Sequence, residues 1–370
     1  MITAERMVDA VGALVQCESP TQDLAACARV CDLAVSAMGD FLPTPASLGA
    51  REGRPYVRWG ADHPEVLLLG HLDTVWPLGT LDRLPWRVEG DRMLGPGVFD
   101  MKAGVVQGWA ALASLAVRHP DRAARTGMLL TTDEETGSAT SRPVIAEAIR
   151  DARAVLVLEP ALGSALKIAR KGTSWYVLTF HGRAAHAGLD PDRGINAAVE
   201  AALFTVASRA WADPAVGTTV TPTLMSAGTT SNTVPAEASV TIDVRAWTAA
   251  EQQRVDSHVR GWALDHSEAT WTIDGGIDRP ALEESMSTAL FARAVDAARR
   301  LGIAHLEGAA VGGASDGNLT AAAGVPTLDG LGAVGDGAHA DHEFASIAGM
   351  VKRSALVSAL LADLLGDSDG

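Results

Sequence analysis

A histidine and an acidic residue follow a strand-like segment early in this sequence. The apolar run at residues 66–69 ends at Gly70, and His71 and Asp73 come directly after it. Strands that are buried on both faces read as continuous apolar runs, and ligands of open α/β sheets collect beyond the carboxyl ends of such strands. His71 is therefore expected where a metal or a substrate would bind, and Asp73 is expected to orient its ring.

Four further candidate ligands follow strand-like runs or lie in glycine-rich loops. They are Asp100, Glu135, Glu159 and His339. Two histidines and three carboxylates suit a borderline metal such as zinc, with cobalt or manganese as substitutes. Five side chains exceed the usual three of one catalytic metal, but they suffice for two ions if one carboxylate bridges them. The sequence therefore predicts a centre of two metal ions that can hold a hydroxide between them and polarise a carbonyl.

The acidic run at residues 133–135 offers a candidate base beside a candidate ligand. Neighbouring residues point in different directions, so Glu135 can bind metal while Glu134 faces the nucleophilic water as general base. Each residue also has an ordinary interpretation: the run could be a solvated acidic turn, and Asp100 could cap a helix. His342 is a rival to His339 as a ligand. The conjunction of all these residues with one placement favours the metal centre.

The elements around these residues predict an α/β fold with two domains. Strands and helices alternate through residues 1–173 and again through 281–370, which indicates a mostly parallel central sheet. Residues 174–280 read as strand, helix, strand, strand, helix and strand, the order of a ferredoxin-like α+β domain, with the second helix expected over 249–267. The sequence therefore predicts a discontinuous catalytic domain, 1–173 with 281–370, and an inserted domain over 174–280.

Composition excludes several classes of partner. Lys and Arg total 30 against 45 Asp and Glu, for a formal net charge of −15, whereas nucleic-acid binding needs a basic surface. No apolar run reaches the roughly 18 residues that span a membrane, and the N-terminus lacks the pattern of a signal peptide. The three cysteines, an odd number without framework spacing, indicate reduced thiols. We expect a cytoplasmic protein that binds neither nucleic acid nor membrane.

Three stretches of the chain carry a family resemblance. Residues 70–75 (GHLDTV), 95–104 (GPGVFDMKAG) and 132–137 (TDEETG) resemble the co-catalytic di-zinc peptidases of the glutamate carboxypeptidase and aminoacylase family, which includes acetylornithine and succinyl-diaminopimelate deacylases. The likeness is closest to glutamate carboxypeptidase and extends over nearly the whole chain. It implies a zinc-peptidase catalytic domain of the phosphorylase/hydrolase-like kind, with an inserted lid and dimerisation domain.

The resemblance also implies a role for each candidate ligand. Asp100 would bridge two zinc ions, with His71 and Glu159 completing one site and Glu135 and His339 the other. The residue before Glu135, Glu134, would be the general base, and Asp73 would support His71. The family pattern further implies a cis peptide bond after the bridging aspartate.

The inserted domain resembles the family in three segments that supply substrate contacts. His186, in the stretch 182–188 (GRAAHAG), matches a histidine that stabilises the oxyanion and in relatives often comes from the partner subunit of a dimer. Asn232 and Arg245 match residues that would grip the carbonyl oxygen and the terminal carboxylate of the substrate. An arginine fork suits a carboxylate because it donates two parallel hydrogen bonds.

Three more residues are predicted to bind substrate by resemblance. Gly313 lies in a glycine-rich turn whose backbone N–H groups could assist carboxylate binding; this turn continues with Ser315 where relatives have threonine. Lys167 and Arg279 lie where glutamate-specific relatives place cations that bind the side chain.

Together these features predict a zinc-dependent hydrolase. It would cleave the amide bond next to a free C-terminal carboxylate, in a peptide or an N-acyl amino acid, because glutamate at the position of Glu159 goes with carboxypeptidases and acyl-amino-acid hydrolases in the family. The resemblance implies a homodimer formed through the inserted domain. A biosynthetic deacylase acting on a dedicated metabolite is the nearer alternative, and a non-catalytic binding protein on the same fold is the remote one.

Overall fold

A computed structural model describes residues 2–366 of the chain. The chain divides into two compact units, Met1–Ala169 with Glu283–Val311 and Ser315–Gly370, and Arg170–Leu282 with Gly312–Ala314. The boundaries 174 and 280 of the inserted domain stay a prediction from the sequence. Within residues 2–366, no helix combines the length and the apolar character needed to cross a lipid bilayer.

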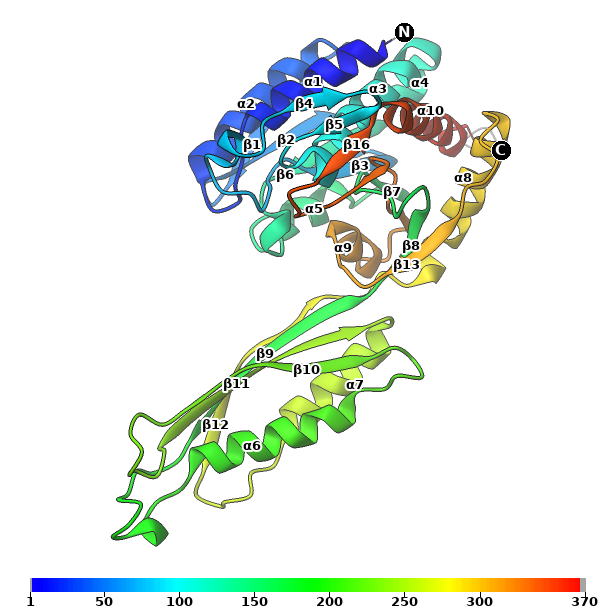
Figure 1. Ribbon diagram of the computed structural model, residues 1–370. Helices are drawn as coiled ribbons and strands as arrows, with labels where there is room; N and C mark the ends of the chain where they lie inside the picture. The colour runs from blue at the N-terminus through cyan, green and yellow to red at the C-terminus, as the bar shows by residue number, and fades with distance from the viewer. Residues whose placement is uncertain (1, 367–370) are drawn as a thin grey trace. The chain divides into compact units, whose positions relative to one another are not determined.

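The first unit is built around a six-stranded, mostly parallel sheet, as predicted (Figure 1). Its strands, in spatial order, are β1 (Ser47–Arg51), β2 (Arg54–Gly60), β6 (Thr126–Thr131), β3 (Val66–His71), β7 (Ala154–Val157) and β14 (Thr327–Leu328). The last four run parallel to one another, and β2 pairs antiparallel to β6. Strands β3, β6 and β7 are buried throughout, which explains their unbroken apolar sequences.

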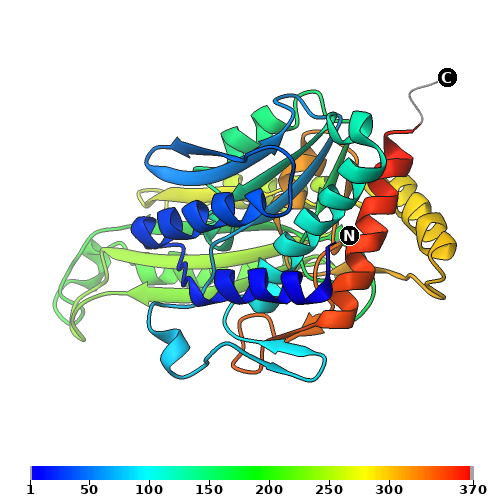
Figure 2. The same ribbon diagram turned by 90° about the horizontal axis from the view of Figure 1, so that it is seen from above.

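Helices cover both faces of this sheet because successive side chains of a strand point to opposite faces. Leu68 packs into the cluster formed with α1 (Ala4–Gln16), α2 (Leu24–Gly39), α3 (Ala103–Arg118) and α10 (Ile347–Leu364). Leu67 and Leu69 pack into the opposite cluster, which contains residues of α5 (Arg142–Ala148) and has Leu319 of α9 (Asp316–Ala322) against it. Figure 2 shows the four helices of the first face lying next to one another.

A small second sheet joins distant parts of the first unit. Its strands, in spatial order, are β15 (Gly335–Asp336), β16 (Phe344–Ser346), β5 (Arg92–Leu94) and β4 (Arg87–Glu89). Because residues 344–346 form β16, the closing helix begins at Ile347. This sheet places the C-terminal loops beside residues 92–94.

The remaining elements of the first unit are short or peripheral. Helices α4 (Pro120–Ala123) and α8 (Thr288–Arg300) flank α3 and α10, respectively, and β8 (Leu166–Arg170) pairs with β13 (Gly308–Val311). The glycine-rich segment around Asp100 forms a single irregular turn, Val98–Lys102, that leads directly into α3.

The second unit has the predicted ferredoxin-like order. Its elements are β9 (Gly172–His181), α6 (Ala197–Ser208), β10 (Thr219–Ala227), β11 (Glu237–Ala246), α7 (Ala249–Arg260) and β12 (Thr270–Arg279). The antiparallel sheet runs β10-β11-β9-β12. Alternate residues of β9, Tyr176, Leu178 and Phe180, are fully buried and pack with Phe204 of α6 and Val255 of α7.

The predicted length of the second helix of this unit is wrong. The helix ends at Arg260 instead of continuing to residue 267. The backbone N–H groups of Asp265 and His266 donate to the buried carboxylate of Glu200, at 3.0 and 2.8 Å, and so cannot continue the helical ladder. Trp262 packs its ring against Phe204 at a centroid distance of 5.6 Å. These tertiary contacts outweigh a sequence pattern that is compatible with helix.

Candidate metal centre

Parallel strands bring three of the five candidate ligands to one edge of the main sheet. His71 is the last residue of β3, and its neighbours β6 and β7 are followed by Glu135 and Glu159. The three strands are adjacent and parallel, so their carboxyl ends meet at the same edge. The sheet therefore brings together residues that are up to 88 positions apart in the sequence.

Asp100 reaches this edge from the irregular turn before α3. The peptide bond Asp100–Met101 is cis, as the family resemblance implied. Met101 is buried at 1% exposure, and the backbone N–H of His71 lies 3.3 Å from its sulfur. The turn and the end of β3 are thus packed directly against each other.

The two carboxylate oxygens of Asp100 face two different histidines. Asp100 Oδ1 lies 3.4 Å from His71 Nε2, and Asp100 Oδ2 lies 3.5 Å from His339 Nε2. Glu159 Oε1 is 3.5 Å from His71 Nε2, whereas Glu135 Oε2 is 3.2 Å from His339 Nε2. The five side chains thus form two halves that share Asp100, which we call the His71 half and the His339 half.

These distances fit pairs of metal ligands better than hydrogen bonds. An N–H···O hydrogen bond usually spans about 2.7–3.2 Å, whereas three of the four separations are 3.4–3.5 Å. Two ligand atoms about 2.0–2.1 Å from one zinc ion, at a tetrahedral angle, lie about 3.3–3.4 Å apart. The buried atoms His71 Nε2, Asp100 Oδ1 and Glu135 Oε1 have no hydrogen-bond partner among the described residues. Donor types, spacing and unpaired atoms all fit two divalent ions.

The local charge also suits cations. Asp100 and Glu135 raise the pKa of His339 to about 10. Burial alone would lower the pKa of His71, but Asp100, Asp73 and Glu159 raise it well above its usual value. Concentrated carboxylates therefore favour a positive charge at both histidines. A divalent ion supplies that charge with the imidazoles neutral, the form in which they bind metal.

Asp73 supports His71 from the side away from the other ligands. His71 Nδ1 lies 3.0 Å from the backbone oxygen of Asp73 and 3.4 Å from its Oδ1. The hydroxyl of Thr21 donates to Asp73 Oδ2 at 2.7 Å, and the N–H of Glu135 donates to the same oxygen at 3.3 Å. Such a carboxylate orients a metal-binding imidazole and fixes its tautomer.

Glu134 and Glu135 belong to one short turn, Glu134–Thr136, but face different groups. A carboxylate oxygen of Glu134 lies within 4.8 Å of ligand atoms of His71 and Glu159. A carboxylate oxygen of Glu135 lies within the same distance of ligand atoms of His71 and Asp100, and its Oε2 is 3.2 Å from His339 Nε2. The turn is anchored by Arg54, whose Nη1 donates to the backbone oxygen of Thr132 at 2.6 Å.

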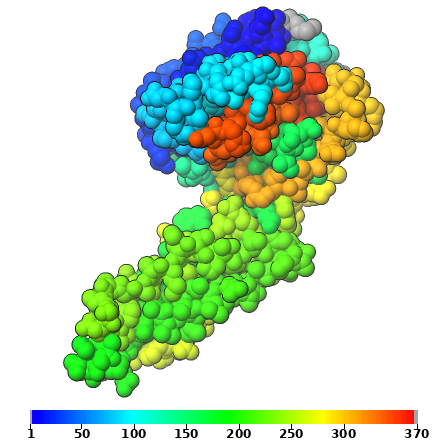
Figure 3. Space-filling model, in the orientation of Figure 1, coloured from blue at the N-terminus to red at the C-terminus, as the bar shows by residue number. Residues whose placement is uncertain are grey.

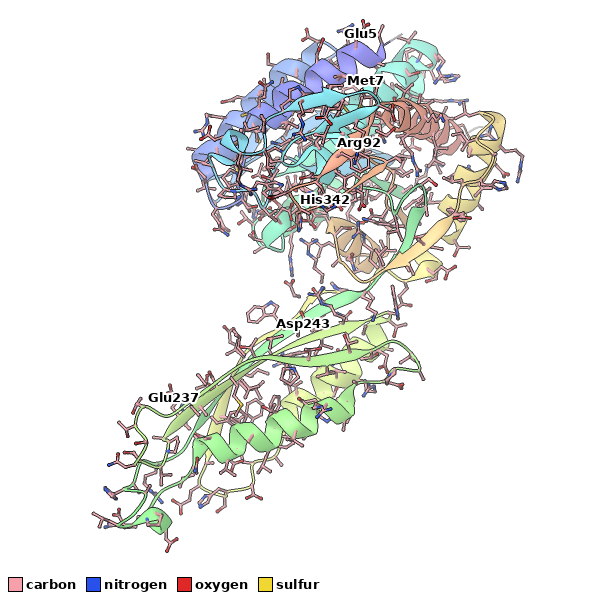
Figure 4. The ribbon with its side chains drawn as sticks, in the orientation of Figure 1. Glu5, Met7, Arg92, Glu237, Asp243 and His342 are labelled. Carbon is pink, nitrogen blue, oxygen red and sulfur yellow. The ribbon has the colours of Figure 1, made fainter. Side chains whose placement is uncertain are left out.

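His339, and not its rival His342, lies beside the carboxylates. The side chain of His339 is 50% exposed, and its backbone has a φ of 62° in a loop that also contains Gly337 at φ 83°. Figure 4 labels His342, which is exposed. Within residues 2–366, no ion pair joins His342 to the ligand carboxylates.

Two of the predicted substrate residues of the second unit lie in adjoining loops. The backbone N–H of Ala187 donates to the backbone oxygen of Asn232 at 2.9 Å, which brings the His186 loop against Asn232. His186 Nδ1 accepts from the N–H groups of Gly188 and Leu189, both at 3.1 Å. The neutral ring must therefore carry its proton on Nε2. His186 and Asn232 are both exposed.

Arg245 already has a carboxylate partner, which sequence analysis did not assign. Its Nε donates to Asp243 Oδ1 at 2.9 Å and its Nη2 donates to Asp243 Oδ2 at 2.9 Å. Figure 4 labels Asp243, which lies two residues earlier on β11. The guanidinium fork thus has the geometry for a carboxylate, and any other carboxylate would compete with Asp243 for it.

The remaining three predicted substrate-binding residues differ in burial and lie in different units. Lys167 is half-buried on β8, and its charge adds to the larger effects of His339 and His71 that lower the pKa of Asp100. Gly313 is exposed, and its backbone oxygen accepts from Arg170 Nη1 at 3.1 Å. Arg279 is 4% exposed, and its backbone oxygen accepts from Gln252 at 3.0 Å. Only Lys167 belongs to the unit that holds the candidate metal ligands.

One acidic residue beside the centre was missed by sequence analysis. Glu343 is 3% exposed and accepts a hydrogen bond from the N–H of Asp100 at 3.1 Å. Its partners lie more than 240 positions away, and the local sequence gives no sign of its burial. Only its spacing of four residues from His339 could have drawn attention to it.

Comparison with known proteins agrees with this architecture. A family model described as peptidase family M20/M25/M40 matches residues 67–363. Carboxypeptidase G2 of Pseudomonas sp. (strain RS-16) is 31% identical over 320 residues, which cover 82% of this chain and 75% of that protein. Succinyl-diaminopimelate desuccinylase of Halorhodospira halophila is 29% identical over 335 residues, covering 84% of this chain and 86% of its own.

The fold also matches solved structures. The crystal structure of a tripeptidase from Staphylococcus aureus aligns with a TM-score of 0.73 at 17% identity and covers 99% of this chain and 100% of that one. At this identity the likeness concerns the fold alone. The resemblance predicted from three short motifs is confirmed by the match over residues 67–363. The chain is therefore an enzyme, a hydrolase of the metallopeptidase and metallo-amidohydrolase type, and belongs to peptidase family M20/M25/M40.

Proposed function

We propose that this enzyme hydrolyses the amide bond next to a free C-terminal carboxylate, in a peptide or an N-acyl amino acid, with two zinc ions bound per chain. The observation that carries the proposal is the bridging arrangement of Asp100, whose two oxygens face His71 and His339 at 3.4 and 3.5 Å. A carboxylate shared in this way is what two neighbouring catalytic ions require. Cobalt or manganese could replace zinc on the same oxygen and nitrogen ligands.

In this proposal His71, Glu159 and Asp100 hold one ion, and Glu135, His339 and Asp100 hold the other. When bound, the two ions polarise the scissile carbonyl and lower the pKa of a water molecule. Glu134 accepts the proton of the attacking water on its carboxylate and delivers it to the leaving amine.

The second unit supplies the remaining contacts in the proposed mechanism. His186 carries its proton on Nε2, since Nδ1 accepts two backbone N–H groups, and this N–H is free to donate to the developing oxyanion. Asn232, in the adjoining loop, donates its amide to the same oxygen.

We assign the C-terminal carboxylate of the substrate to Arg245. In the structure this fork binds Asp243 through two parallel hydrogen bonds of 2.9 Å, so a substrate carboxylate would displace Asp243 and form the same pair. Gly313 would add a backbone N–H, and Lys167 and Arg279 would supply positive charge toward an acidic side chain. A carboxypeptidase among the relatives supports this choice of substrate.

A biosynthetic deacylase is the second candidate function. The desuccinylase relative, whose alignment covers 86% of its own length, favours it. Both candidates use the same ligands and the same general base, so the centre does not distinguish them; the group on the amine side of the amide does. The choice therefore belongs to substrate kinetics.

We also propose a homodimer formed through the second unit. Strand β10 is at the edge of its sheet, paired only with β11 among the described residues. It exposes Leu224 at 70% and Met225 at 51%. An edge strand with exposed apolar side chains can pair with its own copy across a two-fold axis. Sedimentation of the intact chain checks the assembly, and a monomer at working concentration would contradict it.

The cysteines support a reducing compartment, and we propose the cytoplasm. Cys17, Cys27 and Cys31 are free thiols in the structure. Burial raises the pKa of Cys27 to about 11 and that of Cys31 to about 12. Both side chains are 0% exposed and pack as core residues.

The test of the proposed function combines metal analysis with a substrate panel. We expect about two zinc ions per chain and release of a C-terminal amino acid from acyl-glutamates or dipeptides, lost on chelation and restored by zinc. Turnover confined to succinyl or acetyl derivatives of a diamino acid would select the deacylase instead. A fully folded chain that binds no divalent metal would contradict both candidates.

A further inference from the structure

Glu343 is a buried acid in a segment that also carries a candidate ligand. It lies four residues after His339, directly before β16, and is only 3% exposed. A buried carboxylate is costly unless its oxygens are hydrogen-bonded. Its contacts therefore indicate what it stabilises.

Three of the four hydrogen bonds to its carboxylate come from residues 97–100, the segment that ends at Asp100, and the fourth comes from Trp76. Glu343 Oε2 accepts from Trp76 Nε1 and from the N–H of Gly97, both at 2.9 Å. Glu343 Oε1 accepts from the N–H of Phe99 at 2.9 Å and from the N–H of Asp100 at 3.1 Å. An ionised carboxylate offers about four acceptor positions, so this one is saturated by donors.

The two segments are also paired in the small sheet. Phe344 pairs with Leu94 and Ala345 with Met93, immediately before the turn that carries Asp100. Figure 3 shows the surfaces of residues near 90 and near 340 adjoining in the first unit. The carboxylate of Glu343 extends this pairing into the turn, where regular strand hydrogen bonds have ended.

We propose that Glu343 is a positioning residue that fixes the bridging carboxylate of Asp100 relative to His339. Because Glu343 and His339 share one short segment, the bonds that Glu343 accepts from the N–H groups of Phe99 and Asp100 set the spacing of 3.5 Å between Asp100 Oδ2 and His339 Nε2. This inference rests on the proposed two-metal centre. In this role Glu343 would strengthen the binding of the ion in the His339 half without being a ligand itself.

The His71 half depends less on the hydrogen bonds of Glu343. His71 ends a buried strand and is held by Asp73, which is fully buried and bonded to Thr21. His339 is half exposed on a loop. Loss of these hydrogen bonds should therefore weaken metal binding in the His339 half more than in the His71 half.

The test uses Glu343→Gln in the full-length protein. The amide has nearly the same size, but its NH₂ group faces two N–H donors in place of an acceptor oxygen. Partners of this kind typically change metal affinity about 10- to 100-fold. We therefore expect the ion of the His339 half to bind about 10- to 100-fold more weakly in this variant. The affinity is measured by titrating metal-free protein with Co²⁺ against a competing chelator and following the visible absorption of each equivalent.

Two further variants separate positioning from general stability. Glu200→Gln is the matched control, because Glu200 is 2% exposed and also accepts two backbone N–H groups, but in the second unit. It should leave both affinities unchanged even if it lowers the melting temperature. Trp76→Phe removes one of the four donors to Glu343 and should weaken the binding of the ion in the His339 half by a smaller factor.

The outcomes distinguish this inference from the proposed function. If wild-type protein binds two ions and folded Glu343→Gln binds both with wild-type affinity and absorption, the positioning role is overturned while the metal centre stands. If Glu343→Gln does not fold, a wild-type affinity of Trp76→Phe for the ion of the His339 half overturns the positioning role instead. If the wild-type protein fails to bind two ions, the proposed function itself fails.

Discussion

The two halves of the candidate metal centre differ in how they are held. His71 is 1% exposed, ends a fully buried central strand, and contacts Asp73, which accepts a hydrogen bond from Thr21. His339 is 50% exposed and lies on a loop with a left-handed backbone at its own position. The same carboxylate, Asp100, serves both halves.

This difference predicts that the two halves bind their ions with different affinities. Side chains fixed by packing and hydrogen bonds hold a metal ion with little reorganisation. A half-exposed ligand on a loop leaves its side of the centre accessible to water and substrate. We therefore expect the His71 half to bind its ion more tightly and the His339 half to bind its ion more reversibly.

The largest expected effect comes from replacing Glu134, the proposed general base. Glu134→Ala should lower kcat by about 10²- to 10⁴-fold, the usual contribution of a general base, while two metal ions per chain are retained. Steady-state kinetics with metal analysis of the same sample measure both quantities.

The neighbouring residue gives the matched control for this prediction. Glu135→Ala should lose the ion of the His339 half, because Glu135 contacts His339 at 3.2 Å. If Glu134→Ala loses an ion instead, Glu134 is a ligand and not the base. Retained turnover with both ions bound would remove Glu134 from the mechanism altogether.

Replacing each histidine in turn sharpens the comparison of the two halves. His339→Ala should reduce the metal content from two ions to one, with the remaining ion still bound tightly. His71→Ala should retain at most the ion of the His339 half, bound more weakly than the ion left in His339→Ala, since His339 is half exposed on a loop. Isothermal titration of metal-free protein measures both variants. Equal stoichiometry and affinity in the two variants would show that burial does not separate the halves.

The smallest expected effect is at the support of the His71 half. Thr21→Val removes the hydroxyl that donates to Asp73 Oδ2 at 2.7 Å, so the tighter ion should bind about 10-fold more weakly. Competition with a chelator measures this change. Thr320→Val is the control, since it removes another buried hydroxyl, bonded to Thr327 at 2.8 Å, in the same unit. An effect of the same size in both variants would attribute the change to general destabilisation.

Much of the fold could be predicted because local patterns and global packing agree. The unbroken apolar runs of β3 and β7 predicted buried parallel strands, and they are buried throughout. The order of elements between β9 and β12 predicted the ferredoxin-like arrangement. The end of α7 was not predictable, because the amides of Asp265 and His266 bond to Glu200, 65 and 66 residues earlier.

The sequence by itself determined the set of candidate ligands and the family. His71, Asp100 and Glu135 lie in short motifs whose residue types and spacing are set by the chemistry of metal binding, so they can be recognised without coordinates. Strand ends and glycine-rich loops also indicated that these residues would meet at one edge of a sheet.

Only the tertiary structure decided how these residues are held. It distinguished His339 from His342, assigned each oxygen of Asp100 to a different histidine, and showed Asp243 bonded to Arg245 and Glu343 bonded to the Asp100 turn. Burial and hydrogen bonding between residues more than 240 positions apart leave no local pattern in a sequence. The physical reason is that a carboxylate on the surface and a carboxylate saturated by buried N–H groups are the same residue type until the chain has folded around one of them.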